Sequence, residues 1–226
     1  MGIGLKGSPP SILFIGAFAP EISHLRKFEG QEIPVFPGVM LETLECGIGN
    51  ISALLALLKR AGQGGIREAI FVGSCGLYEG EATSLPEWSE TLRVFSTDFY
   101  RYDLSSSLGM SRSPDFLEKE IHSRSGEAAE LLRDALDAAD VSVNSLDYIT
   151  LRDFPSPIWK GVGVENMECF GLAVAAREAR ISLSAILAVT NVVGPEGSSQ
   201  WSQRHARMAD LLQADILRTL GFTQGV

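Results

Sequence analysis

The pattern of hydrophobic and polar positions changes its period several times along the chain. Four short segments, apolar throughout or alternating with polar residues, predict buried strands: 11–17, 39–46, 69–73 and 183–190. Apolar residues three and four positions apart predict amphipathic helices over 126–139 and over 199–220, where Gly221 ends the second one. Strands that alternate with helices in this way indicate an α/β fold of three layers, α/β/α, with a central mixed β-sheet.

Less regular segments lie between these elements. Ile51–Ala61 predicts an apolar helix with Asn50 as its N-cap, and Leu92–Thr97 and Asp147–Leu151 predict further strands. The polar, Ser-rich segment Asp98–Asp115 predicts a loop. A loop of that length inside a compact domain is more often functional than idle.

One stretch, Gly163–Ala176, begins with polar residues and continues with small and apolar ones. That order predicts a loop or strand end that leads into a buried helix. Glu168 falls at the start of this helix, where a carboxylate meets free backbone N–H groups. An acid in a first turn is common, but a carboxylate beside an apolar run needs a partner, and ligand hydroxyls are one such partner.

Composition and charge narrow the range of partners. The chain has 226 residues, 45% of them hydrophobic, which suits a single α/β domain over residues 1–226. A net charge of -9 argues against nucleic acid and anionic membranes, because both bind a basic protein surface. No apolar run has the length of a membrane span, and residues 1–10 lack the apolar core of a signal peptide. A cytoplasmic protein is therefore expected.

The cysteines and histidines do not form a metal-binding pattern. Cys46, Cys75 and Cys169 are odd in number, far apart and surrounded by apolar residues, which is typical of reduced, buried thiols. The three histidines are scattered, without the spacing of metal ligands. No metal is expected.

Four segments that follow predicted strands are polar or rich in glycine: 16–21, 47–50, 73–76 and 190–194. In α/β folds, ligands collect where strands end and loops begin. None of the segments matches a phosphate-binding loop or the glycine pattern of a dinucleotide site, and no nucleophile elbow is present.

Taken in this order, the segments resemble the nucleoside phosphorylase and nucleosidase superfamily, whose members cleave the glycosidic bond between a ribose and a base. The resemblance runs from Ser11 to about Leu212 and rests on five motifs: Ile15–Ile22, Gly47–Asn50, Val72–Gly76, Val164–Glu168 and Val189–Asn191. It implies a central mixed sheet, a small-molecule nucleoside substrate, no cofactor, and a homo-oligomer built from dimers. It also places further substrate-binding positions at Gly16, Ser74, Cys75, Gly76 and Thr190.

The resemblance assigns roles residue by residue. Glu168 matches the acid that accepts hydrogen bonds from the ribose hydroxyls, and Met167 matches the residue that packs against the sugar. A carboxylate there favours the positive charge of an oxocarbenium-like transition state. Glu21 matches the acid that positions and deprotonates water, although an ordinary solvated Glu beside a turn is the alternative. Phe154 occupies the place of an aromatic residue that stacks on the base, with a core Phe as the alternative.

Two departures from the family pattern indicate that water, not phosphate, is the nucleophile. Phe71 stands where hexameric phosphorylases carry an Arg that binds phosphate, and it cannot compensate a phosphate charge. The segment of the second phosphate-binding Arg holds Glu21 instead, whose charge would repel phosphate. The second possibility is a phosphorylase whose phosphate site uses other arginines, such as Arg101, Arg112 or Arg152.

A third departure concerns the base. Adenine-cleaving nucleosidases, which act on methylthioadenosine and S-adenosylhomocysteine, have an Asp where this chain has Asn191. An amide cannot supply a proton, but it offers a donor and an acceptor, which suits a 6-oxopurine such as hypoxanthine. The alternative is an Asn that only fixes the strand end. Thr190–Pro195 with Trp201 further resembles the futalosine hydrolase branch, which acts on a hypoxanthine nucleoside.

The sequence thus predicts a purine nucleosidase that hydrolyses a 6-oxopurine nucleoside such as futalosine. A phosphate-dependent phosphorylase is the enzyme alternative. A nucleoside-binding protein that has lost activity is the alternative from another class, and the presence of both Glu21 and Glu168 argues against it.

Overall fold

A computed structural model describes residues 9–78, 89–102, 119–151 and 162–222. Within these ranges, eight strands form one mixed sheet. They are β1 (Ser11–Gly16), β2 (Met40–Glu45), β3 (Ile66–Leu77), β4 (Arg93–Tyr100), β5 (Glu120–His122), β6 (Ala139–Ser145), β7 (Val162–Asn166) and β8 (Ser182–Val192). The strand order is β2-β1-β3-β7-β6-β4-β5, and β8 pairs in parallel with β3 and antiparallel with β4.

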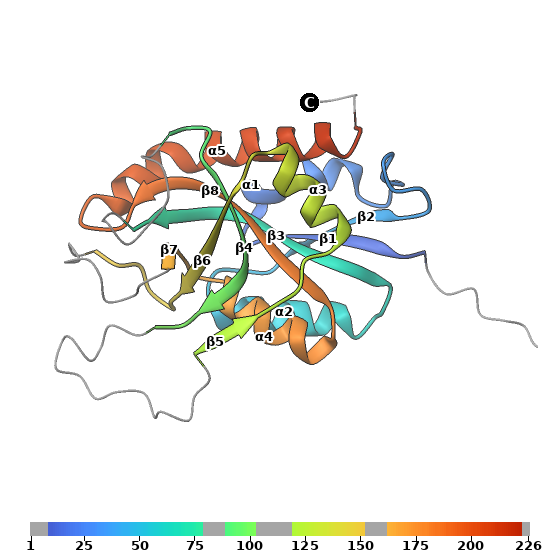
Figure 1. Cartoon of the computed structure of the whole chain (residues 1–226), viewed down its shortest axis with the longest axis horizontal. Coiled ribbons are helices and arrows are strands. Elements are labelled where there is room, and N and C mark those ends of the chain that lie inside the picture. Colours follow the sequence, from blue (N-terminus) through green and yellow to red (C-terminus); the bar gives the residue numbers. More distant parts are fainter. Residues whose placement is uncertain (1–8, 79–88, 103–118, 152–161, 223–226) are drawn as a thin grey trace, which may run out of the picture.

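Helices cover both faces of this sheet (Figure 1). They are α1 (Ala19–Ile22), α2 (Asn50–Ala61), α3 (Glu127–Ala135), α4 (Cys169–Ala179) and α5 (Gly197–Thr219), with a 3-10 turn η1 (Leu25–Phe28) after α1. In Figure 1, α2 and α4 lie on one face of the sheet, whereas α1, α3 and α5 lie on the other. The predicted three-layer α/β/α architecture with a mixed sheet is confirmed.

Both faces of the central strands are buried, which explains why their sequences are continuous apolar runs. In β3, the side chains of Ala69 and Phe71 join the core under α2 and α4. The alternate residues Ile70 and Val72 join a second core under α1, α3 and α5. The same alternation holds in β1 and β8, so the sheet is fixed from both sides.

The predicted strands 11–17, 39–46, 69–73 and 183–190 and the predicted strand Leu92–Thr97 are all present, with β3 and β8 extending further than expected. The helices predicted over Ile51–Ala61 and 199–220 are also present. No helix within the described ranges is both long and apolar enough to cross a membrane.

Four local predictions are wrong, the last of which concerns Asn50. Asp147–Leu151 is not a strand, because β6 ends at Ser145 and this segment turns beside the sheet. Ala139 begins β6 and does not continue the helix, since α3 ends at Ala135 and a left-handed Asp137 turns the chain. Part of the predicted loop Asp98–Asp115 belongs to β4, and its residues 103–118 lie outside the described ranges.

Asn50 is not the N-cap of α2, because it is the first residue of the helix and Gly49 precedes it. Its side chain links distant segments instead. The amide group donates to the Ser145 carbonyl oxygen over 3.1 Å, and its oxygen accepts the Gly171 N–H over 2.8 Å. A Cβ on Gly171 would approach the Asn50 backbone oxygen to 2.0 Å, so only glycine allows α4 to lie this close to α2.

Candidate active site

One cavity of about 370 Å³ lies at the carboxyl ends of β1, β3 and β8, where the starts of α4 and α5 meet the sheet. This is the edge at which α/β folds bind ligands. The residues that line it are Ala17, Phe18, Glu21, Ile48, Ser74, Cys75, Gly76, Ile149, Thr150, Leu151, Glu165, Asn166, Met167, Glu168, Asn191, Val193, Gly197, Ser198, Trp201 and Ser202.

Glu21 reaches the cavity from α1 and is almost fully buried. One carboxylate oxygen, Oε2, accepts the Ala17 N–H over 2.8 Å. The other, Oε1, accepts the Ser74 N–H over 3.1 Å and the Ser74 hydroxyl over 3.2 Å. Gly16 permits this arrangement, because a Cβ there would approach the Ile22 side chain to 2.6 Å and push α1 away from β1.

The surroundings of Glu21 raise its pKa to about 8. Burial is the main cause, since it disfavours the charged form, and the nearby Glu168 carboxylate adds to it. The hydrogen bonds from Ala17 and Ser74 oppose the shift because they stabilise the carboxylate. A carboxyl group with a pKa close to neutral is suited to exchange protons with water during catalysis.

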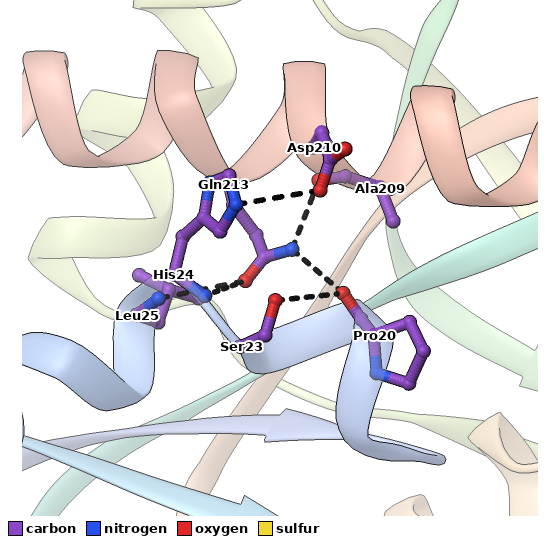
Figure 2. A network of polar contacts seen from close by, with 7 residues as sticks. All are labelled: Pro20, Ser23, His24, Leu25, Ala209, Asp210 and Gln213. Atoms are coloured by element: carbon purple, nitrogen blue, oxygen red, sulfur yellow. Dashed lines mark hydrogen bonds and ion pairs between the residues drawn. The ribbon is translucent and has the colours of Figure 1, made fainter.

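Gln213 of α5 holds the segment that carries Glu21 in place (Figure 2). Its amide oxygen accepts the His24 N–H over 2.8 Å, and its amide nitrogen donates to the Pro20 carbonyl oxygen over 2.9 Å and to Ala209 over 3.1 Å. The Gln213 side chain has no solvent exposure. A helix as short as α1 gains little stability on its own, so these bonds fix its position against α5.

Glu168 faces the same cavity at the start of α4 and is also buried. Its Oε1 accepts the Gly49 N–H over 2.9 Å, and burial raises its pKa. The Asn166 side chain accepts the N–H groups of Glu168 and Cys169 over 2.7 and 3.0 Å, and donates to the Ser74 carbonyl oxygen. Asn166 therefore joins β3 to the helix that presents Glu168, while the adjacent Met167 lines the cavity.

The opposite wall of the cavity is built on three neighbouring strands. Asn191 of β8 and Glu165 of β7 both stand in register with Gly76 of β3. A Cβ on Gly76 would come within 2.8 Å of the Asn191 amide nitrogen, so glycine at this position lets the Asn191 side chain lie close against β3. The Asn191 amide donates to Val192 over 3.1 Å and accepts the Thr190 hydroxyl over 3.0 Å.

Two residues expected at the site do not line the cavity, and a third is not among the described residues. Thr190 does not line the cavity, because its hydroxyl turns toward the Cys75 carbonyl oxygen and the Asn191 side chain. Gly16 does not line it either and acts through the placement of α1. Phe154 lies outside the described residues.

Sequence reasoning missed a buried polar group on this wall. Glu165 accepts the Thr150 N–H over 3.0 Å, the Thr150 hydroxyl over 2.6 Å and the Tyr78 hydroxyl over 2.7 Å. The contact with Glu165 and burial together raise the pKa of Tyr78, with burial as the larger cause. The sequence feature that could have indicated Glu165 is the polar Glu165-Asn166 pair at the end of an apolar strand, because buried polar side chains need fixed partners.

Aromatic residues form the wall next to Glu21. Phe18 and Trp201 line the cavity with ring centroids 6.2 Å apart. The Trp201 ring stacks on His205 at 4.1 Å, with an interplanar angle of 11°. Trp201 also donates its indole N–H to the Ser74 hydroxyl oxygen over 3.1 Å.

Among the described residues, no Lys or Arg lines the cavity. Phe71, at the position where phosphorylases carry an Arg, is fully packed in the core under α2 and α4. Arg101 does not line the cavity and pairs with Asp147 over 2.5 Å. Arg112 and Arg152 lie outside the described ranges.

No group of three or more His, Cys, Asp and Glu side chains within the described ranges could hold a metal ion. The three cysteines are buried free thiols, as predicted. Burial raises the pKa of Cys75, the cysteine that lines the cavity, far above its usual value, so its thiol stays protonated.

Comparisons with known proteins identify the fold. No protein-family model matches the chain, and no curated protein matches it. Among solved structures, the chain is similar to the 5'-methylthioadenosine/S-adenosylhomocysteine nucleosidase of Helicobacter pylori, in complex with butyl-thio-DADMe-Immucillin-A. The TM-score is 0.74 at 14% identity, and the match covers 94% of this chain and 97% of that one.

Two further structures resemble the chain to a similar degree. For the nucleosidase of the same name from Neisseria meningitidis, with methylthio-immucillin-A, the TM-score is 0.71 at 17% identity, covering 94% of this chain and 98% of that one. For futalosine hydrolase of Helicobacter pylori, the TM-score is 0.71 at 14% identity, covering 93% and 97%. The chain therefore has the fold of the nucleoside phosphorylase and nucleosidase superfamily, as the sequence motifs suggested.

Proposed function

We propose that the protein is a purine nucleosidase that hydrolyses the N-glycosidic bond of a 6-oxopurine nucleoside, such as futalosine. The observation that carries the proposal is the pair of buried carboxylates, Glu21 and Glu168, that face one cavity. Structures with this fold include nucleosidases and a futalosine hydrolase, which supports the same reaction class.

We propose that Glu168 holds the ribose. Its Oε1 is bound to Gly49, while its position on the cavity wall leaves the carboxylate able to accept ribose hydroxyls. Cleavage of the glycosidic bond develops positive charge on the ribose ring, and a carboxylate in a buried site stabilises that charge strongly. Met167 lines the cavity beside it, and we propose that it packs against the sugar.

Glu21 is the base that activates water. Its Oε2 accepts a single backbone N–H, from Ala17, so this oxygen can accept a further hydrogen bond from a water molecule in the cavity. As the water attacks the ribose, its proton moves to the Glu21 carboxylate. Once ionised, this carboxylate also disfavours phosphate, because the two negative charges repel.

Asn191 is proposed to hold the leaving base. Its amide can donate to a purine oxygen or nitrogen and accept from a ring N–H, whereas an adenine-cleaving site gains from a protonated acid. A 6-oxopurine leaves more readily as an anion, so hydrogen bonds can replace full protonation. We propose Gly76, Cys75 and Ser74 as the floor of the same cavity.

The base preference gives the first prediction. Wild-type protein should cleave inosine-type nucleosides better than adenosine-type ones, and Asn191→Asp should reverse that order. A base with the wrong pattern of donors and acceptors leaves a buried polar group unpaired. This costs about 1–3 kcal/mol, which lowers kcat/KM roughly ten- to a hundredfold. The measurement is kcat/KM for both nucleoside types in both proteins. Equal loss for both bases would reduce Asn191 to a residue that fixes the end of β8.

Base release, measured together with nucleoside binding, separates the alternatives. A nucleoside-binding protein without activity would bind inosine-type nucleosides in calorimetry but release no base. A phosphorylase would need a phosphate site, and we propose against it because the described cavity wall contains no cationic side chain.

We also propose that the protein forms a homodimer through an apolar surface at the mouth of the cavity. The apolar side chains that would form it are exposed: Ile48, Ile149 and Leu151, and on α2, which begins two residues after Ile48, Ile51, Leu55 and Leu58. Ile48, Ile149 and Leu151 also line the cavity, so a second copy on this surface would shield the site from water. Large exposed apolar surfaces of this kind are typical of interfaces.

Light scattering should therefore report at least a dimer. Ile51→Asp, at a side chain that is 72% exposed, should yield monomers with weaker nucleoside cleavage. Leu131→Asp on α3, outside this surface, is the matched control and should leave the assembly intact. A wild-type protein that is monomeric and fully active would contradict the proposal.

A further inference from the structure

A chain of hydrogen bonds connects α5 to the carboxylate of Glu21. The Trp201 indole N–H donates to the Ser74 hydroxyl oxygen over 3.1 Å, and the Ser74 hydroxyl donates to Glu21 Oε1 over 3.2 Å. We propose that Trp201 is a positioning residue for the catalytic base, because it holds the Ser74 hydroxyl in the orientation that stabilises the Glu21 carboxylate. This inference rests on the role proposed for Glu21.

The chemistry of the three groups sets the direction of the chain. An indole nitrogen can only donate, so it must use the oxygen of Ser74 as its acceptor. The single proton of the hydroxyl is then directed to Glu21, the acceptor on its other side. A free hydroxyl could instead rotate toward other acceptors or water, and its bond to the carboxylate would be weaker on average.

Trp201 is itself held firmly. Its ring stacks on His205 with centroids 4.1 Å apart, and the His205 Nδ1 lies 3.1 Å from the Trp201 carbonyl oxygen. Phe18 packs on the same cluster, with ring centroids 6.2 Å from Trp201 and 6.1 Å from His205. The donor is therefore preorganised and loses little freedom when the hydrogen bond forms.

Other titratable groups face Glu21 as well: Cys46, Cys169, Glu168 and His205. Burial raises the pKa of both thiols far above neutral pH, so they carry no charge. Glu168 raises the pKa of Glu21 by charge repulsion. Phe in place of Trp201 keeps a ring for His205 to stack on and leaves all four groups in place, so it removes the N–H donor alone.

The test is a double-mutant cycle with Trp201→Phe, Ser74→Ala and both changes together. On the acid side of its pH profile, here called the acid limb, kcat/KM rises as the base ionises. Each single variant should shift this limb to higher pH by about one unit, because a hydrogen bond to the ionised base is weakened or lost. The double variant should show the Ser74→Ala shift and no more, because Trp201 acts through the Ser74 hydroxyl.

A second readout needs no substrate. Titration of the Glu side-chain carboxyl carbons by carbon-13 NMR, with Glu21→Gln to assign the signal, should show the same upward shifts in the free protein. If wild-type protein releases no base yet these shifts appear, the proposed reaction fails while the positioning role stands. If the enzyme is active and the Glu21 signal in Trp201→Phe titrates as in wild type, the positioning role alone fails.

Phe18→Leu is the matched control. It removes a neighbouring ring from the cavity wall but no hydrogen bond to Ser74, so KM should change while the acid limb and the Glu21 titration stay in place. A Trp201→Phe effect confined to KM, or one that persists in full in the Ser74→Ala background, would overturn the proposal. Either result would mean that Trp201 only lines the cavity and does not position Glu21.

Discussion

Glu168→Gln should lower kcat/KM by about 10²–10³-fold, the loss that typically follows removal of one electrostatic stabiliser of a transition state. The amide keeps the shape of the side chain and its acceptor for the Gly49 N–H, but it loses the negative charge opposite the developing ribose cation. Steady-state kinetics with a 6-oxopurine nucleoside measures the effect. The loss should appear in kcat, because the charge matters most in the transition state.

Glu68→Gln provides a control of the same residue type and burial. Glu68 is 2% exposed and accepts the N–H groups of Ala128 and Ala129 at the start of α3, away from the cavity. It should lower thermal stability, because the helix loses part of a charged cap, but keep the activity of the folded protein. Near-normal turnover in a folded Glu168→Gln variant would mean that Glu168, like Glu68, has only a structural role.

Glu21→Gln should reduce kcat by roughly 10²–10⁴-fold, the usual contribution of a general base. In wild-type protein, the base must be ionised, and its pKa lies at about 8. The kcat/KM of the wild type should therefore rise with pH and level off above about 8. The residual activity of Glu21→Gln should lose this limb, since an amide does not titrate. An unchanged acid limb in the variant would exclude Glu21 as the base.

The same substitution should remove a pH-dependent loss of stability. The folded protein holds the Glu21 proton more tightly than the unfolded chain does, because the pKa rises from 4.5 to about 8 on folding. Stability from this group is therefore complete below pH 4.5 and is lost as the pH rises to about 8. A Gln at this position does not titrate, so the Tm of wild type should fall relative to that of the variant across this range. A buried base that weakens its own fold is typical of an active site.

Much of the fold could be predicted from local patterns. The central strands β1, β3 and β8 are apolar on both faces, so their sequences are recognisable without knowledge of their partners. β6 was missed because its residues, from Ala139 to Ser145, carry polar side chains satisfied by neighbouring segments. Asp147–Leu151 has the composition of a strand, yet Thr150 is held by Glu165 in an irregular turn.

The candidate site was predictable where a residue touches the cavity and stands in a motif, as Glu21, Ser74 and Glu168 do. Residues that act through others were not predictable. Gln213 is 192 positions from Glu21 in the sequence, and its role depends on how α5 packs on α1. The hydrogen bond between Trp201 and Ser74 likewise exists only after α5 has docked beside β3.

The most direct test of the account is product analysis with and without phosphate. With Phe71 in the core and Glu21 at the cavity wall, water is the expected nucleophile. Incubation with inosine or futalosine in phosphate-free buffer should release hypoxanthine and the free sugar, at a rate that added phosphate does not increase. A sugar 1-phosphate as the main product, together with loss of base release when phosphate is removed, would contradict the account and establish a phosphorylase.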